Sequence, residues 1–170
     1  MDRTATAIPV TAAAPFEEFF EAERLRLLRA LYLLCGNAEE AEEILQDAFL
    51  ALWERWDRVA GMDDPTGYLY RTALNRYRSR ARRAVRAARR VVGHAHGADL
   101  FAAADERDAL ARALAQLTPR RREALILTEL HGYGSVEAGR AMGVSDVTVR
   151  RLAQEARADL RRTLEETDDG

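Results

Sequence analysis

Cysteine, lysine and long apolar runs are scarce or missing in this sequence of 170 residues. Its one cysteine, Cys35, excludes a disulfide framework and a CxxC metal site, and its place on an apolar stripe predicts a small core residue in a reducing compartment. No stretch resembles a signal peptide or a membrane span, so we expect a cytoplasmic protein without membrane insertion. All 26 basic residues are arginines, whose planar guanidinium groups suit phosphates and guanine edges.

Histidine is also sparse. His94, His96 and His131 are the only three, and none has cysteine or carboxylate at ligand spacing. We therefore expect no metal site, no cofactor and no catalytic residue. An enzyme with a buried acid–base or metal site is a function class that the sequence does not favour.

Glycine and proline number only 10 and 4, while apolar residues make up 48% of the chain. With alanine and leucine prominent, this composition predicts an all-α protein. The length allows one or two small domains, and we expect two helical domains joined by a linker, the second ending in a helix-turn-helix. The expected boundaries are a disordered tail over 1–15, a first domain over 16–92, a linker over 93–105, a second domain over 106–164 and an acidic tail over 165–170.

Apolar periodicity predicts two helices in the first domain, from Phe16 to Cys35 and from about Ala38 to Trp56. The second of these has Trp53 in its apolar stripe and carboxylates on its other face. That face carries Glu39, Glu40, Glu42, Glu43, Asp47 and Glu54, with Gln46 and the apolar Leu50 between them. A solvated surface is the ordinary interpretation, but an apolar side chain among carboxylates also fits docking on a basic partner.

A basic helix is predicted to begin at Pro65, with Asp64 as its cap. Nine arginines and no acidic residue lie between Arg71 and Arg90. Such a run would repel itself without a polyanion. Side chains that can stack on or hydrogen-bond to bases are interleaved with it, namely Tyr68, Tyr70, Asn75 and Tyr77. We expect this helix to face DNA, with a charged solvated helix as the alternative.

The segment from Leu114 to Arg162 predicts a helix-turn-helix. Gly143 can end the first helix in a left-handed conformation, Val144 supplies an apolar plug, and Ser145 can cap the second helix. The small residue Gly139 allows the two helices to approach closely. The second helix then presents outward Arg150, Arg151, Gln154 and Arg157, which can contact base edges and phosphates in a major groove. An ordinary helical hairpin with a solvated arginine face is the alternative.

This order of elements resembles the extracytoplasmic-function (ECF, group 4) sigma factors of bacterial RNA polymerase, over nearly the whole chain. AEEILQDAFLALWERWDRV, residues 41–59, is similar to the region 2 helix that binds the clamp helices of the largest polymerase subunit. PTGYLYRTALNRYRSRARR, residues 65–83, is similar to the helix that binds and melts the promoter's −10 element. ALAQLTPRRREALILTELHGYGSVEAGRAMGVSDVTVRRL, residues 113–152, is similar to region 4, which reads the −35 element.

The resemblance implies three sets of contact residues. Contacts with core polymerase would be made by Glu43, Gln46, Asp47 and Leu50. Contacts with the −10 element would be made by Tyr68, Arg71, Asn75, Arg78, Arg82 and Arg83, beside a loop from Arg58 to Gly67 that receives a flipped base. Contacts with the −35 element would be made by Thr148, Arg150, Arg151, Gln154 and Arg157.

A sigma factor is not itself an enzyme, because it directs the catalysis of the polymerase to chosen promoters. The resemblance implies core RNA polymerase, promoter DNA and an anti-sigma factor as partners, and we expect the free protein to be monomeric. The alternative is a stand-alone helix-turn-helix regulator, or a degenerate sigma-like protein, that binds DNA without forming holoenzyme. Binding to polymerase separates the two hypotheses.

Overall fold

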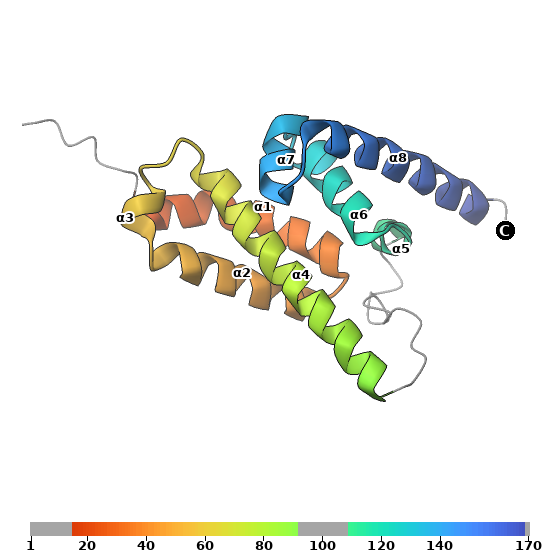
Figure 1. Ribbon diagram of the computed structural model, residues 1–170, viewed down its shortest axis with the longest axis horizontal. Helices are drawn as coiled ribbons and strands as arrows, with labels where there is room; N and C mark the ends of the chain where they lie inside the picture. The colour runs from red at the N-terminus through yellow and green to blue at the C-terminus, as the bar shows by residue number, and fades with distance from the viewer. Residues whose placement is uncertain (1–14, 92–108, 169–170) are drawn as a thin grey trace, which may run out of the picture.

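The structure is a computed structural model that describes residues 15–91 and 109–168, and every regular element in these two ranges is helical (Figure 1). The first half of the chain contains α1 (Phe16–Cys35), α2 (Ala38–Trp53), α3 (Trp56–Val59) and α4 (Pro65–Val91). The second half contains α5 (Ala109–Ala115), α6 (Pro119–Leu125), the π-helical turn η1 (Ile126–Leu130), α7 (Ser135–Met142) and α8 (Asp146–Asp168). The all-α prediction is confirmed. The predicted linker, with His94 and His96, and nearly all of the predicted N-terminal tail lie outside the described residues.

Several helix ends follow from local sequence signals. Gly36 adopts a left-handed conformation, with φ of 67°, and ends α1, because a residue without Cβ takes that conformation at little cost. Asn37 caps α2 by accepting a hydrogen bond from the Glu40 amide at 3.0 Å. Asp64 caps α4 in the same way, at 2.7 Å from the Gly67 amide. These caps fix where the chain changes direction.

Two predicted boundaries are wrong. The helix expected from Ala38 to Trp56 ends at Trp53, because Arg55 leaves the helical conformation with φ of −130° before the short α3 begins. The acidic tail expected from residue 165 onward continues α8 as far as Asp168. The predicted starts of α1 and α4 are confirmed.

The first half is built on the packing of α1 against α2, with α4 lying across both (Figure 1). Leucine and isoleucine side chains from all three helices are fully buried between them, including Leu31, Ile44 and Leu69. Cys35 is a buried free thiol, and burial raises its pKa well above the ordinary range. The prediction that Cys35 is a core residue is therefore confirmed.

The two halves share one apolar core. Ile126, Leu127 and Met142 of the second half belong to the same buried cluster as Leu31 and Tyr70 of the first. This cluster forms because α7 packs along α4 while η1, α5 and α6 pack against α1 (Figure 1). The helix-turn-helix is thus held at a fixed position beside the basic helix.

Candidate polymerase and nucleic-acid interfaces

The residues predicted to contact polymerase lie on one side of α2 and are solvent-accessible. Glu43 and Gln46 are exposed, Asp47 is half-buried, and the Leu50 side chain is 58% exposed although it is apolar. These positions lie three or four residues apart, so they share one side of the helix. An exposed leucine among acidic and amide groups forms a small apolar centre with a polar rim, the pattern of a protein-binding surface.

Trp53 extends this face by one turn and was missed by the sequence analysis, which assigned it to the buried stripe. Its side chain is 55% exposed, and its ring packs edge-on against Phe16 with centroids 5.0 Å apart. Its position in the sequence, three residues after Leu50 and seven after Gln46, places it on the same side of the helix and could have indicated this role. Exposed tryptophan is enriched at protein interfaces because it offers a large rigid contact area.

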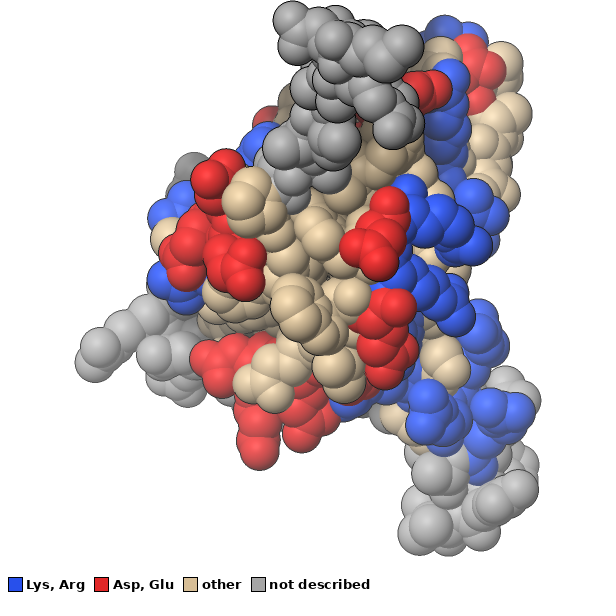
Figure 2. Space-filling view, turned by 90° about the vertical axis from the view of Figure 1, so that its left-hand side faces the viewer, with Lys and Arg blue, Asp and Glu red and all other residues tan. Residues whose placement is uncertain are grey.

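The carboxylates of this face also pair with arginines of α4. The Arg80 guanidinium forms ion pairs with Glu43 and Asp47, and Arg76 approaches Asp47 at 3.6 Å. The hydrogen bond to Glu43 raises the pKa of Arg80 above its ordinary value. Figure 2 shows the result as a column of arginine side chains with carboxylates directly beside it. The charges that the sequence segregates along the chain are thus adjacent in space.

The residues predicted to contact the −10 element fall on one stripe of α4. Tyr68, Arg71, Asn75, Arg78 and Arg82 are spaced by three or four residues, so their Cα atoms follow one side of the helix. Of these, Arg71, Asn75 and Arg82 are exposed, as is the neighbouring Arg83. The helix thus brings together residues to which the family resemblance assigns one role.

A polar hollow of about 400 Å³ lies between α2 and α4 beside this stripe. Tyr68, Asn75 and Arg83 line it together with Ser79. The guanidinium groups of Arg55 and Arg58 favour the ionised phenol and lower the pKa of Tyr68. An aromatic ring, an amide and guanidinium groups around one hollow can stack on a base, hydrogen-bond to its edge and neutralise its phosphate.

Three residues of α4 are placed differently from the rest. Tyr70 and Tyr77 are 2% and 1% exposed, so the expectation that they reach DNA bases is wrong in this structure. Burial raises the pKa of Tyr77 to about 12, as expected for a phenol within the core. Arg78 points toward the second half of the chain and pairs there with Glu123. Sequence periodicity could have shown the burial of both tyrosines, since they occupy positions seven residues apart.

The helix-turn-helix has the predicted geometry. Gly143 adopts φ of 70°, and the Ser145 hydroxyl accepts a hydrogen bond from the Thr148 amide at 3.2 Å. A Cβ atom added to Gly139 would lie 2.7 Å from the carbonyl oxygen of Val144, closer than side-chain atoms approach a backbone. Glycine at 139 is therefore needed for the close packing of α7 on the turn.

The predicted −35 contacts project from the first turns of α8. Arg150, Arg151, Gln154 and Arg157 are all exposed, and Thr148 is half-buried. Arg150 pairs with Asp146 at 2.8 Å and Arg151 with Glu155 at 2.8 Å, each within the helix. Surface pairs of this kind contribute about 0–1 kcal/mol, so phosphates or base edges can displace the carboxylates. These predicted contact residues are therefore accessible on the surface of α8.

Two further observations concern other kinds of site. Within residues 15–91 and 109–168, no three histidine, cysteine or carboxylate side chains gather in a way that could hold a metal ion. None of the helices in these ranges is long and apolar enough to cross a membrane.

Comparison with known families agrees with this geometry. The family model described as Sigma-70 region 2 matches residues 19–87, and the model described as Sigma-70, region 4 matches residues 107–160. The first match covers α2 and α4 as far as residue 87, and the second covers the helix-turn-helix. The chain therefore belongs to the sigma-70 family.

Individual relatives refine this assignment. The chain is 28% identical over 155 residues to the RNA polymerase sigma-E factor of Streptomyces avermitilis, covering 90% of this chain and 87% of that protein. It is also 28% identical over 155 residues to the ECF RNA polymerase sigma factor SigM of Mycobacterium tuberculosis, covering 88% of this chain and 76% of that one. These relatives identify it as an ECF sigma factor, a class that regulates transcription and does not consist of enzymes.

Solved structures show the same fold. The sigma factor RpoE of Bartonella quintana, crystallised with the anti-sigma factor NepR, superposes with a TM-score of 0.77 at 20% identity, covering 88% of this chain and 96% of that chain. CnrH in complex with the cytosolic domain of CnrY superposes with a TM-score of 0.64 at 25% identity, covering 89% of this chain and 88% of that chain. Both are complexes with a second protein.

Proposed function

We propose that this chain binds core RNA polymerase and directs promoter-specific initiation by recognising the −35 and −10 elements and assisting promoter melting. The observation that carries the proposal is the exposed Leu50 within the carboxylate face of α2, directly beside the basic helix. A stand-alone DNA-binding regulator needs no such protein-docking face. We assign polymerase binding to Glu43, Gln46, Asp47 and Leu50, with Trp53 added.

The energetics of promoter melting support the assignment of α4. Opening a duplex costs about 1.4 kcal/mol per base-pair step, and contacts with the opened strand can offset that cost. Stacking of an unpaired base on an aromatic ring returns about 1–3 kcal/mol. The hollow beside Tyr68, with the exposed arginines of α4 along it, provides the two kinds of contact that hold an opened strand.

We assign recognition of the −35 element to the exposed first turns of α8. Arginine can donate two parallel hydrogen bonds to guanine, and glutamine can make paired bonds to adenine. Further arginines of the same helix would hold phosphates and fix its register in the groove. These contacts agree with the accessibility of Arg150, Arg151 and Gln154.

We also propose an anti-sigma factor as a regulatory partner, a monomeric free state, and action in the cytoplasm, where polymerase and DNA are found. Support for the regulatory partner comes from RpoE, a protein of the same fold that was solved with the anti-sigma factor NepR, and from CnrH, which was solved with the cytosolic domain of CnrY. Chemical cross-linking of tagged chain in its own cells, followed by identification of the bound proteins, tests this proposal.

The deciding experiment is run-off transcription with core polymerase from the same source, on genomic fragments, with and without the purified chain. Discrete new transcripts are the expected result, and their upstream sequences would give the promoter motif. Binding to duplex DNA without transcripts and without co-purification of core polymerase would instead establish the stand-alone regulator.

A further inference from the structure

Val147 is an apolar side chain that lies exposed on the helix assigned to the −35 element. It is 61% exposed, more than Leu50 of α2. It occupies the second position of α8, in the turn that begins the helix. Single exposed apolar residues are common on protein surfaces, so exposure alone gives Val147 no role. A role depends on what surrounds the side chain and on what it contributes to the free chain.

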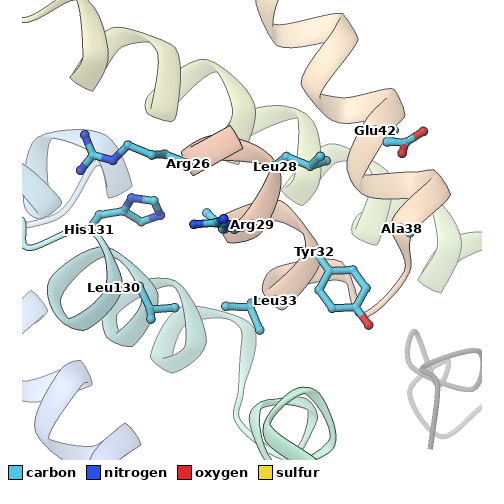
Figure 3. A pocket seen from close by; sticks show the side chains of 10 residues that line it. Arg26, Leu28, Arg29, Tyr32, Leu33, Ala38, Glu42, Leu130 and His131 are labelled. Carbon is cyan, nitrogen blue, oxygen red and sulfur yellow. The ribbon is translucent and has the colours of Figure 1, made fainter. Parts of the chain in front are cut away.

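Other exposed apolar side chains have apolar neighbours on another helix. Leu130 lies in a cleft of about 660 Å³ and faces Leu33 of α1 across it (Figure 3). Trp53 packs its ring against Phe16 of α1. Val147 belongs to neither of the apolar clusters that the described residues form. The folded chain therefore gains little packing energy from an apolar side chain at this position.

The first turn of a helix is also an unfavourable place for valine in a free protein. A β-branched side chain has a lower helix propensity than alanine. The helix dipole favours carboxylates in the first turn, where α8 has Asp146 directly before the valine. Valine therefore stabilises the free chain less than alanine or a carboxylate would at this position.

The turn of the helix-turn-helix holds the backbone beneath Val147 in place. The Ser145 hydroxyl accepts a hydrogen bond from the Thr148 amide at 3.2 Å, and the Ser145 carbonyl oxygen accepts one from the Val149 amide at 3.0 Å. The Val149 side chain is fully buried below the turn. Rotation about χ1 of a β-branched side chain is restricted as well. The two methyl groups of Val147 therefore hold a fixed position and can contact a partner at a small entropic cost.

Charged side chains surround Val147 on α8. Arg150 and Arg151 lie three and four residues further along the chain, so they share one side of the helix with Val147. Their carboxylate partners, Asp146 and Glu155, belong to α8 itself. The core of a protein interface would bring further apolar or aromatic side chains to this place, whereas arginines suit phosphates and guanine edges. The charge pattern favours DNA over a protein as the partner of this valine.

The major groove displays one apolar group on its base edges. This group is the C5 methyl group of thymine, and the first residues of a recognition helix are those that contact base edges. We propose that Val147 selects a thymine in the −35 element by covering its C5 methyl group. The proposal rests on the proposed function, because it takes α8 as the helix that enters the groove. It adds an apolar base contact to the polar contacts assigned to α8.

The test removes methyl groups from each side of the contact. Uracil replaces each thymine of the −35 element in turn, on either strand, because it pairs as thymine does and lacks only the C5 methyl group. Val147→Ala removes the two methyl groups of the protein. Val136→Ala is the matched control, because Val136 is a valine of similar exposure, 53%, at the second position of α7. Electrophoretic shift titrations with core polymerase and each full chain measure the affinity for promoter duplex.

We expect one uracil substitution to weaken promoter binding by the native chain about fourfold, the effect of one buried methylene-sized group. With Val147→Ala the same substitution should change the affinity by less than about twofold, because the methyl group has lost its partner. Val136→Ala should retain the fourfold loss. Equal losses for the native chain and Val147→Ala, or no loss at any thymine with the native chain, would overturn the proposal. A −35 element without thymine on either strand would also overturn it.

The failures of the two proposals are distinguishable. Promoters that are bound and transcribed equally well with thymine and with uracil would refute the contact of Val147 and leave the proposed function standing. Absence of run-off transcripts from every fragment would refute the proposed function, and the thymine contact with it. Because Val147 is exposed, Val147→Ala should keep the native thermal midpoint, which separates a lost contact from a lost fold.

Discussion

Truncation of Leu50 to alanine should weaken binding to core polymerase without affecting the fold. Full burial of a leucine side chain is worth about 1.5–3 kcal/mol, and 58% of this side chain is exposed in the free protein. Covering that fraction on docking would therefore contribute about 1–2 kcal/mol. Since about 1.4 kcal/mol corresponds to a tenfold change, we expect the dissociation constant to rise about five- to thirtyfold.

The assay is a titration of labelled core polymerase with each chain, followed by fluorescence anisotropy or microscale thermophoresis. Leu25→Ala is the control, because Leu25 is a leucine of similar exposure, 49%, on α1 and away from the carboxylate face. The control should bind as the native chain does, and both variants should retain the native thermal midpoint. Equal affinities for Leu50→Ala, Leu25→Ala and the native chain would refute the assignment of this face.

Three further predictions test other parts of the structure. Gly139→Ala places a Cβ 2.7 Å from a backbone carbonyl oxygen of the turn. Overpacking of this kind costs about 1–3 kcal/mol, whereas the higher helix propensity of alanine contributes about 1 kcal/mol. A lowered thermal midpoint is expected. Gly61→Ala is the control, because a Cβ there would meet only the carbonyl oxygen of Arg58, at an ordinary contact distance of 3.8 Å. An unchanged midpoint for Gly139→Ala would contradict the close packing. Burial lowers the pKa of His131 to about 4 from an ordinary 6.5. Because the unfolded chain binds this proton more tightly, stability should be fully present above pH 6.5 and fall by roughly 3 kcal/mol as the pH drops to 4. Urea unfolding at the two pH values should show a smaller loss of unfolding free energy in His131→Gln than in the native chain. An equal loss in both chains would exclude His131 as the cause. Arg150→Ala combined with Arg151→Ala should flatten the salt dependence of binding to promoter duplex by about 1.8 in an electrophoretic shift series, and an unchanged slope would remove both residues from the phosphate contacts.

Ion pairs between helices reduce the number of arginines that are free to bind an anionic partner. Formal net charge is only −2, although one helix is strongly basic and another strongly acidic. In the structure Arg76 and Arg80 are neutralised by the carboxylates of α2, and Arg78 by Glu123. The arginines without such partners across helices, such as the exposed Arg82 and Arg83, face solvent on α4. The free cationic surface is therefore narrower than the arginine count alone indicates.

Local features were predictable from the sequence because short-range physics decides them. A glycine at position 36 or 143 ends a helix wherever the rest of the chain lies, since the left-handed conformation penalises other residues. Asn37, Asp64 and Ser145 cap helices through bonds that span only three residues. The helical class and the helix-turn-helix follow from such signals together with apolar periodicity, and the family follows from their order.

Long-range contacts decided the rest. Periodicity could not show that Tyr70 lies against His131, 61 residues further along the chain, or that Arg78 meets Glu123 across 45 residues. Spacing from Leu50 and Gln46 places Trp53 at the edge of the apolar stripe of α2, but only the packing of α1 and α4 shows that its side chain remains 55% exposed. The sequence by itself determined the helices, their caps and the chemistry that each face carries. Only the tertiary structure decided which faces are free, because one core shared by both halves brings the helix-turn-helix against α4 and covers part of its basic stripe.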